Sequence, residues 1–293
     1  KLLSDSLPAD LGYLYENAVA QIIACADIHF RNLEYLNELQ EVLENFIEQC
    51  KKIVEEVGDP QKVRIVIAGD LVESKITISN ECTLALGWFL REMNKICPVI
   101  VIGGNHDTVL SNLQRLDSLT PIFSIGEYDN ITYLDADLEY QSGCKVDDNV
   151  VWCLYSMFDD YNRPEIEEMK IRYPDKTFVG IIHADINGAV DFNGRSTEHG
   201  LDSNIFKDLD FVIAGHIHKR QEIKKNGVKV VYCSSIRQKD FGETVTGHGF
   251  VLWDVASKEY EFVDTPNPNQ GYYKFEINSI DDIEANKEVL MNL

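Results

Sequence analysis

Five short apolar runs in this chain each end in aspartate, asparagine or histidine, and this repeated ending constrains the fold more than any other feature. The runs are rich in valine and isoleucine, which is typical of strands buried in a sheet. A long amphipathic helical pattern over residues 32–57 separates the first two runs, and another over 79–95 precedes the third. Strand, helix and strand in succession predict a parallel α/β sheet, in which successive strands end at one edge. The runs occupy residues 19–26, 63–68, 98–102, 177–182 and 211–214.

The side chains that follow these runs are of the types that bind divalent metal ions. Residues i and i+2 at the end of a strand point the same way, so that Asp27 shares a face with His29, and His216 with His218. Any one of these residues alone would be read as a turn residue, a surface histidine or a core histidine, but all five endings together favour a metal site. The candidate residues are Asp27, His29, Asp70, Asn105, His106, His183, His216 and His218.

Oxygen and imidazole ligands without thiolates favour manganese, iron or zinc over calcium or a structural zinc site. If His106 instead contacts a group bound to the metal, seven ligands remain. Seven exceed what one ion takes from a protein while leaving room for substrate. Two ions that share one carboxylate would accommodate all seven ligands.

The chain is strongly acidic, with 27 basic against 49 acidic residues and a net charge of −22. Such a surface repels nucleic acid and anionic membranes, so a polyanionic substrate needs a local positive feature or a partner. The seven cysteines are scattered without the paired spacing of a zinc or redox site, which is typical of buried thiols in a reducing cytoplasm. Neither a membrane-length apolar run nor a signal peptide is recognisable, so we expect a cytoplasmic protein, or one of the host cytoplasm if it is viral.

The domain organisation is predicted from composition shifts along the chain. Residues 1–18 are expected to be an N-terminal extension, and 19–265 to form the core. The run Pro266 to Gly271 is the clearest boundary, and 266–293 is expected to be a linker and the beginning of an incomplete cap domain.

Several further elements are predicted in the second half of the chain. The last three core strands lie close together in the sequence, as they would in a meander that closes a second sheet. The predicted strands are 131–134, 150–155, 228–233, 249–255, 260–263 and one starting at 272–277, and the predicted helices are 162–173 and 281–293.

The ordered set of motifs resembles the calcineurin-like metallophosphoesterase superfamily over roughly residues 20–265. Within it, the chain most resembles the SbcD-type DNA repair nucleases, especially the bacteriophage recombination-nuclease subunits. This resemblance implies a two-sheet α/β/β/α sandwich. The motifs are Asp27-x-His29, Gly69-Asp70, Gly104-Asn105-His106-Asp107, His183 to Gly188, Glu198-His199-Gly200-Leu201, Gly215-His216-x-His218 and Gly249 to Asp254.

Carried over residue by residue, the resemblance implies two ions, of manganese first and of iron, zinc or magnesium as alternatives. Asp27, His29, Asp70 and His218 would hold one ion, and Asp70, Asn105, His183 and His216 the other, so that Asp70 bridges them. His106 would be the catalytic histidine, whereas Asp107 is expected to brace its loop. The chain departs from the family at Glu73, where many of the nucleases have a histidine three residues after the bridging aspartate.

The function implied is that of a DNA nuclease, either exonuclease or endonuclease, in double-strand break repair or recombination. A small-molecule phosphodiesterase or phosphatase of the same superfamily is the alternative, and a metal-free binding module a third. The resemblance also implies an SMC-like ATPase partner and a homodimer formed by apolar helices at 79–95 and 111–119, which could equally be ordinary core helices. Because basic residues are few, we expect the chain alone to bind DNA weakly.

Overall fold

The computed structural model of the chain describes most of its residues. The predicted extension at 1–18 lies outside them, apart from Ala18, and the predicted boundary at 265–266 stays a prediction. The described residues are 18–33, 35–112, 115–225, 227–268, 271–273, 277 and 279–287.

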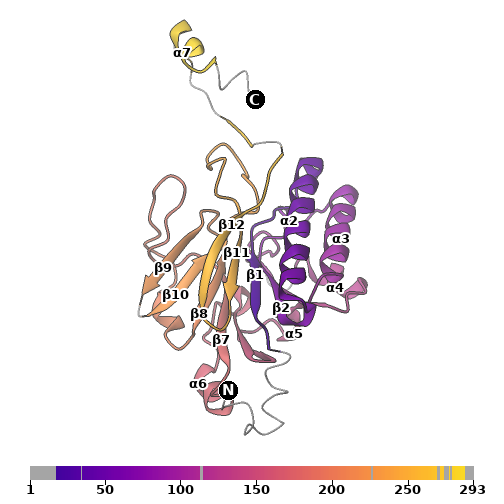
Figure 1. Cartoon of the computed structure of the whole chain (residues 1–293), viewed down its shortest axis with the longest axis vertical. Helices are drawn as coiled ribbons and strands as arrows, with labels where there is room; N and C mark the ends of the chain where they lie inside the picture. The colour runs from indigo at the N-terminus through magenta and orange to yellow at the C-terminus, as the bar shows by residue number, and fades with distance from the viewer. Residues whose placement is uncertain are drawn as a thin grey trace, which may run out of the picture.

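Twelve described strands form two six-stranded sheets (Figure 1). In the first sheet the order is β12-β11-β1-β2-β3-β4; β1 to β4 are parallel, β11 is antiparallel to β1, and β12 is antiparallel to β11. The four parallel strands therefore end at one edge, as the sequence predicts. The strands of this sheet are β1 (Gln21–Cys25), β2 (Val63–Ala68), β3 (Val99–Ile102), β4 (Ile131–Tyr133), β11 (Gly249–Asp254) and β12 (Glu259–Asp264).

The second sheet has the order β5-β6-β7-β8-β10-β9. Strands β6, β7, β8 and β10 are parallel, and antiparallel strands β5 and β9 form its two edges. Its strands are β5 (Gly143–Asp147), β6 (Val150–Tyr155), β7 (Thr177–His183), β8 (Phe211–Gly215), β9 (Gln221–Lys225) and β10 (Val228–Tyr232).

The two sheets pack face to face, and helices cover their outer faces (Figure 1). Between the sheets, the rings of Phe211 in β8 and Trp253 in β11 stack with centroids 4.0 Å apart. Helices α2 (Leu36–Val57) and α3 (Asn80–Asn94) bury their apolar stripes against the first sheet, and α6 (Ile166–Arg172) packs on the second. The predicted α/β/β/α sandwich is therefore confirmed.

The helix predicted at residues 111–119 is wrong, because the described part of that segment forms turns. A six-residue helix, α4 (Thr120–Ile125), begins just after it. The Asp117 carboxylate accepts hydrogen bonds from the main-chain N–H groups of Leu119 and Thr120, and Pro121 lies in the first turn of α4. Both features favour a helix that begins near residue 120, later than the spacing of the leucines predicted. One of the two helices proposed for a homodimer bundle is thus absent among the described residues, and the homodimer stays a prediction.

The meander predicted for the last core strands is also wrong. β10 belongs to the second sheet, whereas β11 and β12 extend the first sheet from β1. The connection 233–248 is long enough to cross between the sheets, and β11 has buried residues on both faces, so it suits the middle of a sheet. The next predicted strand, 272–277, forms no strand at its described residues 272–273 and 277. The last described helix is α7 (Ile280–Ala285).

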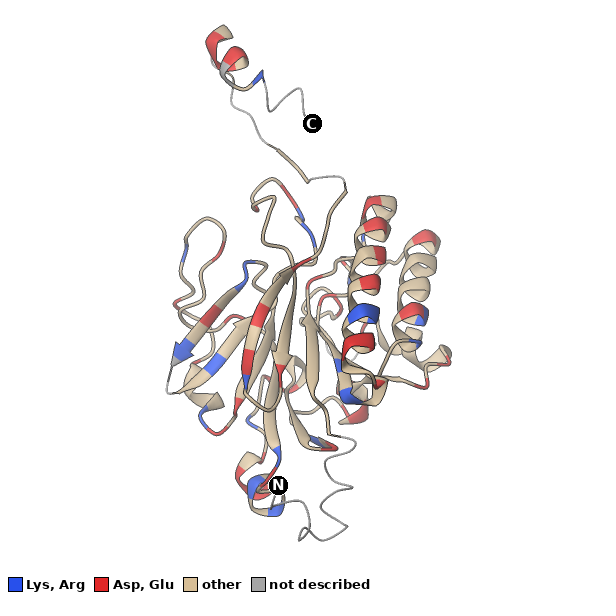
Figure 2. Cartoon of the chain, viewed as in Figure 1, with Lys and Arg blue, Asp and Glu red and all other residues tan. Residues whose placement is uncertain are grey.

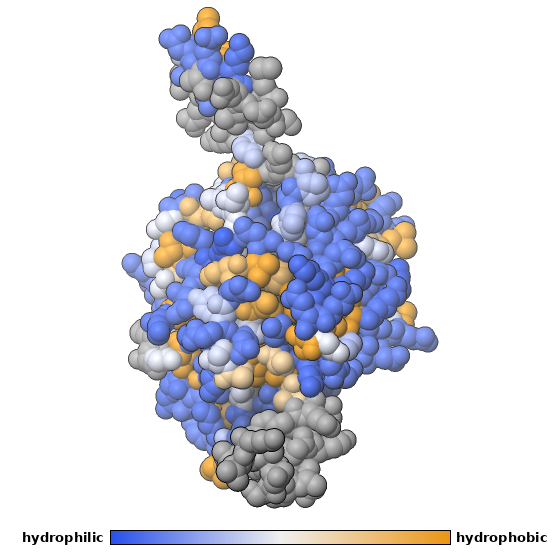
Figure 3. All heavy atoms as spheres, in the orientation of Figure 1, coloured by the Kyte–Doolittle hydropathy of each residue, from blue (hydrophilic) through white to orange (hydrophobic). Residues whose placement is uncertain are grey.

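The surface agrees with the acidic composition. Figure 2 shows acidic residues at many positions along α2, and Figure 3 shows a largely hydrophilic face with a small hydrophobic area near its middle. None of the described helices is both long enough and apolar enough to span a bilayer. The described structure also contains α5 (Leu134–Asp137) and short 3₁₀ helices at Pro60–Lys62, Met157–Asp159 and Ser203–Phe206.

Candidate metal centre

The ends of five strands meet at one edge of the sandwich and bring all seven predicted ligands together. The first sheet supplies those after β1, β2 and β3, and the second those at the ends of β7 and β8. His183 of β7 reaches across to the first sheet, where its Nδ1 lies 2.8 Å from the carbonyl oxygen of Ala68 at the end of β2. The site is therefore built at the seam between the two sheets.

Four of the predicted ligands surround a first position. The Nε2 atoms of His29 and His218 are 3.1 Å apart, and His218 Nε2 lies 3.6 Å from Asp27 Oδ1. His29 Nε2 lies 3.7 Å from Asp70 Oδ2 and 3.9 Å from Asp27 Oδ1. Ligand atoms that each lie about 2.1 Å from one ion are roughly 3–4 Å from one another, so these donors fit a single divalent ion.

The other donors surround a second position. His183 Nε2 lies 3.0 Å from Asn105 Oδ1 and 3.3 Å from Asp70 Oδ2, and His216 Nδ1 lies 2.7 Å from Asn105 Oδ1. The same oxygen, Asp70 Oδ2, thus belongs to both sets, as expected of a bridging carboxylate. Its partner Oδ1 accepts a hydrogen bond of 2.7 Å from the main-chain N–H of His106.

The histidines of the first position each contact a glutamate through their other ring nitrogen. His29 Nδ1 lies 2.7 Å from Glu73 Oε2, and His218 Nδ1 lies 2.5 Å from Glu243 Oε1. Such outer carboxylates fix the tautomer and the orientation of a ligating imidazole. In the sequence, Glu73 stands out only as a departure from the family, and Glu243 gives no signal because it lies in a loop without periodicity.

The histidines of the second position have different outer partners. His183 Nδ1 donates to the carbonyl oxygen of Ala68, so that Nε2 is the ring nitrogen that faces the second position. His216 Nε2 lies 3.2 Å from Asp185 Oδ2. Asp185 stands two residues after His183, so the same strand-end spacing could have identified it as a site residue.

Several site residues have positive φ angles, which residues other than glycine rarely adopt. Asp27, His29 and Asp70 have φ of 54°, 53° and 54°, and His216 has φ of 94°. Strained backbone of this kind is kept only where many surrounding contacts hold it in place, and it is common at functional sites. Gly104 also serves the site, because a Cβ at that position would collide with Asp70 Oδ1.

Burial and charge shift the pKa values of the ligands in opposite directions. Burial lowers the pKa of His29 to about 4, despite the contacts with Glu73 and Asp70. Burial would also lower the pKa of His183, but the Asp70 carboxylate raises it to about 10. The neutral His29 is therefore ready to bind a cation, whereas a metal ion at the second position must displace a proton from His183.

Asp107 braces the loop that carries Asn105 and His106. Its buried carboxylate accepts hydrogen bonds of 2.9 Å from Val72 N–H and 2.8 Å from Gly104 N–H. Burial and the neighbouring Asp70 charge raise the pKa of Asp107 to about 8, although these hydrogen bonds lower it. The geometry agrees with the bracing role predicted from the sequence.

His106 stands at the edge of the site and is more exposed than the buried ligands Asp27, His29 and Asp70. Its Nδ1 donates to the carbonyl oxygen of Glu73 at 3.0 Å, which leaves Nε2 to contact another group. The His106 and His29 rings are 4.9 Å apart between centroids. His106 is therefore held beside the first position with one ring nitrogen available.

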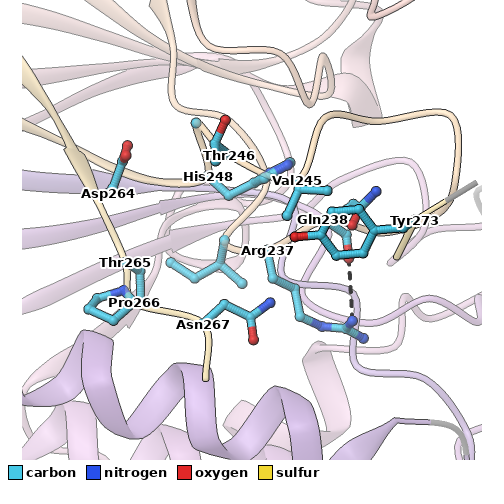
Figure 4. Close-up of a pocket in the computed structure, with 12 residues that line it drawn as sticks. Arg237, Gln238, Val245, Thr246, His248, Asp264, Thr265, Pro266, Asn267 and Tyr273 are labelled. Atoms are coloured by element: carbon cyan, nitrogen blue, oxygen red, sulfur yellow. Dashed lines mark hydrogen bonds between the residues drawn. The ribbon is translucent and has the colours of Figure 1, made fainter. Parts of the chain in front are cut away.

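Two cavities lie near the loop 233–248. One of about 260 Å³ adjoins His216 and His218, and Phe192 and Lys219 also line it. The other, of about 380 Å³, lies between this loop and residues 264–267 and contains none of the seven predicted ligands (Figure 4). The first cavity is the one placed to receive part of a substrate.

The chain is similar in sequence to known proteins. The sequence matches the family described as calcineurin-like phosphoesterases over residues 20–220. It is 31% identical over 278 residues to an uncharacterized protein of Acanthamoeba polyphaga mimivirus, covering 92% of this chain and 19% of that protein. It is 23% identical over 266 residues to the SbcD subunit of the nuclease SbcCD of Staphylococcus saprophyticus, covering 82% of this chain and 66% of that protein.

A solved structure shares the fold. The dimetal phosphatase from Danio rerio superposes with a TM-score of 0.50 and 13% identity, over 81% of this chain and 93% of that one. The chain spans about a fifth of the length of the mimivirus relative and about two thirds of the staphylococcal nuclease subunit.

Proposed function

The chain belongs to the calcineurin-like phosphoesterase family, and from this premise we propose that it is a two-metal phosphodiesterase that acts as a DNA nuclease. The family consists of metal-dependent phosphoester hydrolases with a dinuclear centre. The observation that carries the proposal is the pair of donor sets that share Asp70 Oδ2. Seven oxygen and imidazole donors without a thiolate favour manganese, iron or zinc. The resemblance to the SbcD-type nucleases supports manganese first among these and adds magnesium as an alternative.

The nuclease assignment is supported by the order of the motifs and by the staphylococcal relative, which is named as a nuclease subunit. On this proposal the chain acts in double-strand break repair or recombination. It would cleave DNA as an exonuclease or endonuclease in the cytoplasm, or in the host cytoplasm if it is viral.

On this proposal, the residues of the site have distinct roles in the reaction. Two divalent ions, when bound, would polarise the phosphoryl oxygens and lower the pKa of a bound water. Asp70 holds both positions at a fixed spacing, and the outer partners of the histidines keep the ring nitrogens aimed at them. His106, with Nδ1 held by the Glu73 carbonyl, presents Nε2 to the phosphate or to the departing oxygen.

The acidic surface requires a separate source of DNA affinity. Lysine and arginine contacts to phosphate dominate binding to nucleic acid, and this chain has 27 basic residues against 49 acidic ones. We propose that an SMC-like ATPase partner supplies the groove and that the isolated chain binds DNA weakly. Nanomolar binding of a duplex by the isolated chain at physiological salt would contradict this part of the proposal.

A small-molecule phosphodiesterase or phosphatase is the second candidate. The cavity of about 260 Å³ beside His216 and His218 favours it, because it is slightly smaller than the roughly 300–1,000 Å³ of typical small-ligand pockets and so suits a small substrate. Asp191, Asp240 and Glu243 line that cavity together with Lys219, so a second phosphate group would meet repulsion there.

The two candidates are separated by their substrates. The chain would be given end-labelled linear DNA and, separately, bis(p-nitrophenyl) phosphate, each with manganese. We expect time-dependent shortening of DNA that chelation abolishes, and an unchanged rate in His199→Ala, an exposed histidine outside the metal centre. Turnover of the aryl diester without any DNA cleavage, even with the ATPase present, would favour the second candidate.

A further inference from the structure

Lys239 lies in the loop 233–248 and contacts both glutamates that back the first metal position. Its Nζ lies 3.0 Å from Glu73 Oε2, and its main-chain N–H donates to Glu243 Oε2 at 2.8 Å. The side chain is only 16% exposed, so it does not extend freely into solvent. One residue therefore joins two carboxylates that are distant in the sequence.

These contacts close a ring around the first position. From Lys239 the ring passes through Glu73 to His29, and through Glu243 to His218. It closes where the two Nε2 atoms of His29 and His218 lie 3.1 Å apart. Displacement of any member would alter the directions of the two histidine ligands relative to each other.

Lys239 is also held in place from outside the ring. Arg31 donates to its carbonyl oxygen at 3.2 Å, and Gln238 Nε2 donates to the carbonyl oxygen of Glu243 at 2.9 Å. The same Glu73 oxygen, Oε2, contacts both Lys239 Nζ and His29 Nδ1. The ammonium group thus pairs with the same carboxylate oxygen that lies against the His29 ring.

We propose that Lys239 is a positioning residue that sets the affinity of the first metal position by holding Glu73 and Glu243 on the two histidines. The proposal rests on the two-metal centre of the proposed function. It also gives a role to Glu73, the position at which the chain departs from the nucleases that it resembles.

A simple lysine–glutamate ion pair is the alternative interpretation, and the chain contains one for comparison, in which the Glu259 side chain is 72% exposed. Lys229 Nζ lies 2.6 Å from Glu259 Oε1, and its side chain is 18% exposed. Neither residue contacts a metal-ligand side chain in the described structure. Lys229→Met is therefore a matched control for Lys239→Met.

The sign of the effect separates positioning from simple electrostatics. Removal of a positive charge near a cation site would, by Coulomb attraction alone, strengthen metal binding. Lys239→Met opens the ring at Glu73 and keeps the main-chain N–H contact with Glu243. We expect this opening to have the opposite effect, because loss of outer-partner contacts typically weakens metal affinity about 10- to 100-fold. A weaker first ion in Lys239→Met thus reports positioning.

The experiment is a manganese titration of the metal-free chain, followed by electron paramagnetic resonance of free Mn²⁺ and by calorimetry. We expect Lys239→Met to weaken one of the two ions about 10- to 100-fold and the other by less than about twofold, with Lys229→Met unchanged. Glu73→Gln should show the same loss, and the double variant should lose little more, because both changes break one ring. Lys239→Arg should recover part of the affinity.

Unchanged or tighter binding of both ions in Lys239→Met would overturn the proposal. A folded wild-type chain that binds fewer than two ions would instead contradict the proposed function, so the two failures are distinguishable. Matching circular dichroism spectra and melting temperatures of the variants would establish that all are folded. Additive losses in the double variant would show that Glu73 and Lys239 act independently and would also overturn the proposal.

Discussion

The two metal positions of this chain share one carboxylate but are built differently. At the first, the histidine ligands are backed by Glu73 and by Glu243, whose side chain is 8% exposed, and both glutamates lie in loops. At the second, His183 is backed by a strand carbonyl, and His216 by Asp185, whose side chain is 48% exposed. The first position therefore depends on the paths of two loops, and the second mainly on the strands. We expect substitutions to affect the two ions unequally.

The largest effect is expected at Asp70, the carboxylate that the two metal positions share. Asp70→Ala removes the one oxygen that lies in both donor sets, so both ions should bind weakly and turnover should fall to background. Metal analysis after dialysis, together with the rate on bis(p-nitrophenyl) phosphate, measures this. Retention of two ions with full activity would remove Asp70 from its bridging role.

His106→Ala should leave both positions intact and still lose most of the activity. The predicted ligand sets do not include His106, although one of its ring nitrogens lies within 4.8 Å of ligand atoms of His29 and Asp70. Its Nδ1 is held by the Glu73 carbonyl, and its available Nε2 is placed to act on the substrate. Loss of a general acid or base typically costs about 10²–10⁴-fold in rate. Rates and metal content measured on the same sample would check this; a collapse of metal content would place His106 among the ligands instead.

Glu243→Gln and Asp185→Asn test whether the outer carboxylates of the two positions contribute unequally to metal binding. The buried contact of Glu243 with His218 should matter more than the half-exposed contact of Asp185 with His216, because solvent screens the latter. We expect about 10- to 100-fold weaker binding of one ion in Glu243→Gln, and a smaller loss in Asp185→Asn. Manganese titrations of the two variants side by side give the answer, and equal losses would contradict the proposed difference.

The smallest expected effect is a proton released on metal binding. The pKa of His183 is raised to about 10 by Asp70 against the effect of burial, so near neutral pH the metal-free second position holds this proton. The pKa of His29 is lowered to about 4, so that ligand holds none. Metal binding should therefore release about one proton from His183, and affinity at the second position should rise with pH up to about 10. Calorimetry in buffers of different ionisation enthalpy measures the release, and its persistence in His183→Asn would assign it elsewhere.

The strand-built part of the site could be predicted from the sequence, and the loop-built part could not. Asp27 and Asp70 lie two residues after the ends of β1 and β2, and His183 ends β7, so parallel pairing within each sheet brings them to one edge of the sandwich. Glu243 lies in a connection without periodicity, and its approach to His218 depends on a crossing between sheets that the sequence did not reveal. The same crossing explains why β11 and β12 were predicted in the wrong sheet.

The helix predicted at 111–119 failed for a related reason. Leucine spacing indicated a helical face there, but local hydrogen bonds to Asp117 and the ring of Pro121 place the helix start later. Side-chain to main-chain hydrogen bonds of this kind compete with periodicity and are weakly encoded in spacing.

The most direct test of the two-ion centre is the electron paramagnetic resonance spectrum of the wild-type chain titrated with manganese. Two ions held by one bridging carboxylate should bind at two per chain and give an exchange-coupled spectrum, which should disappear in Asp70→Ala. A single uncoupled Mn²⁺ per folded chain, unchanged by that substitution, would contradict a two-ion centre bridged by Asp70.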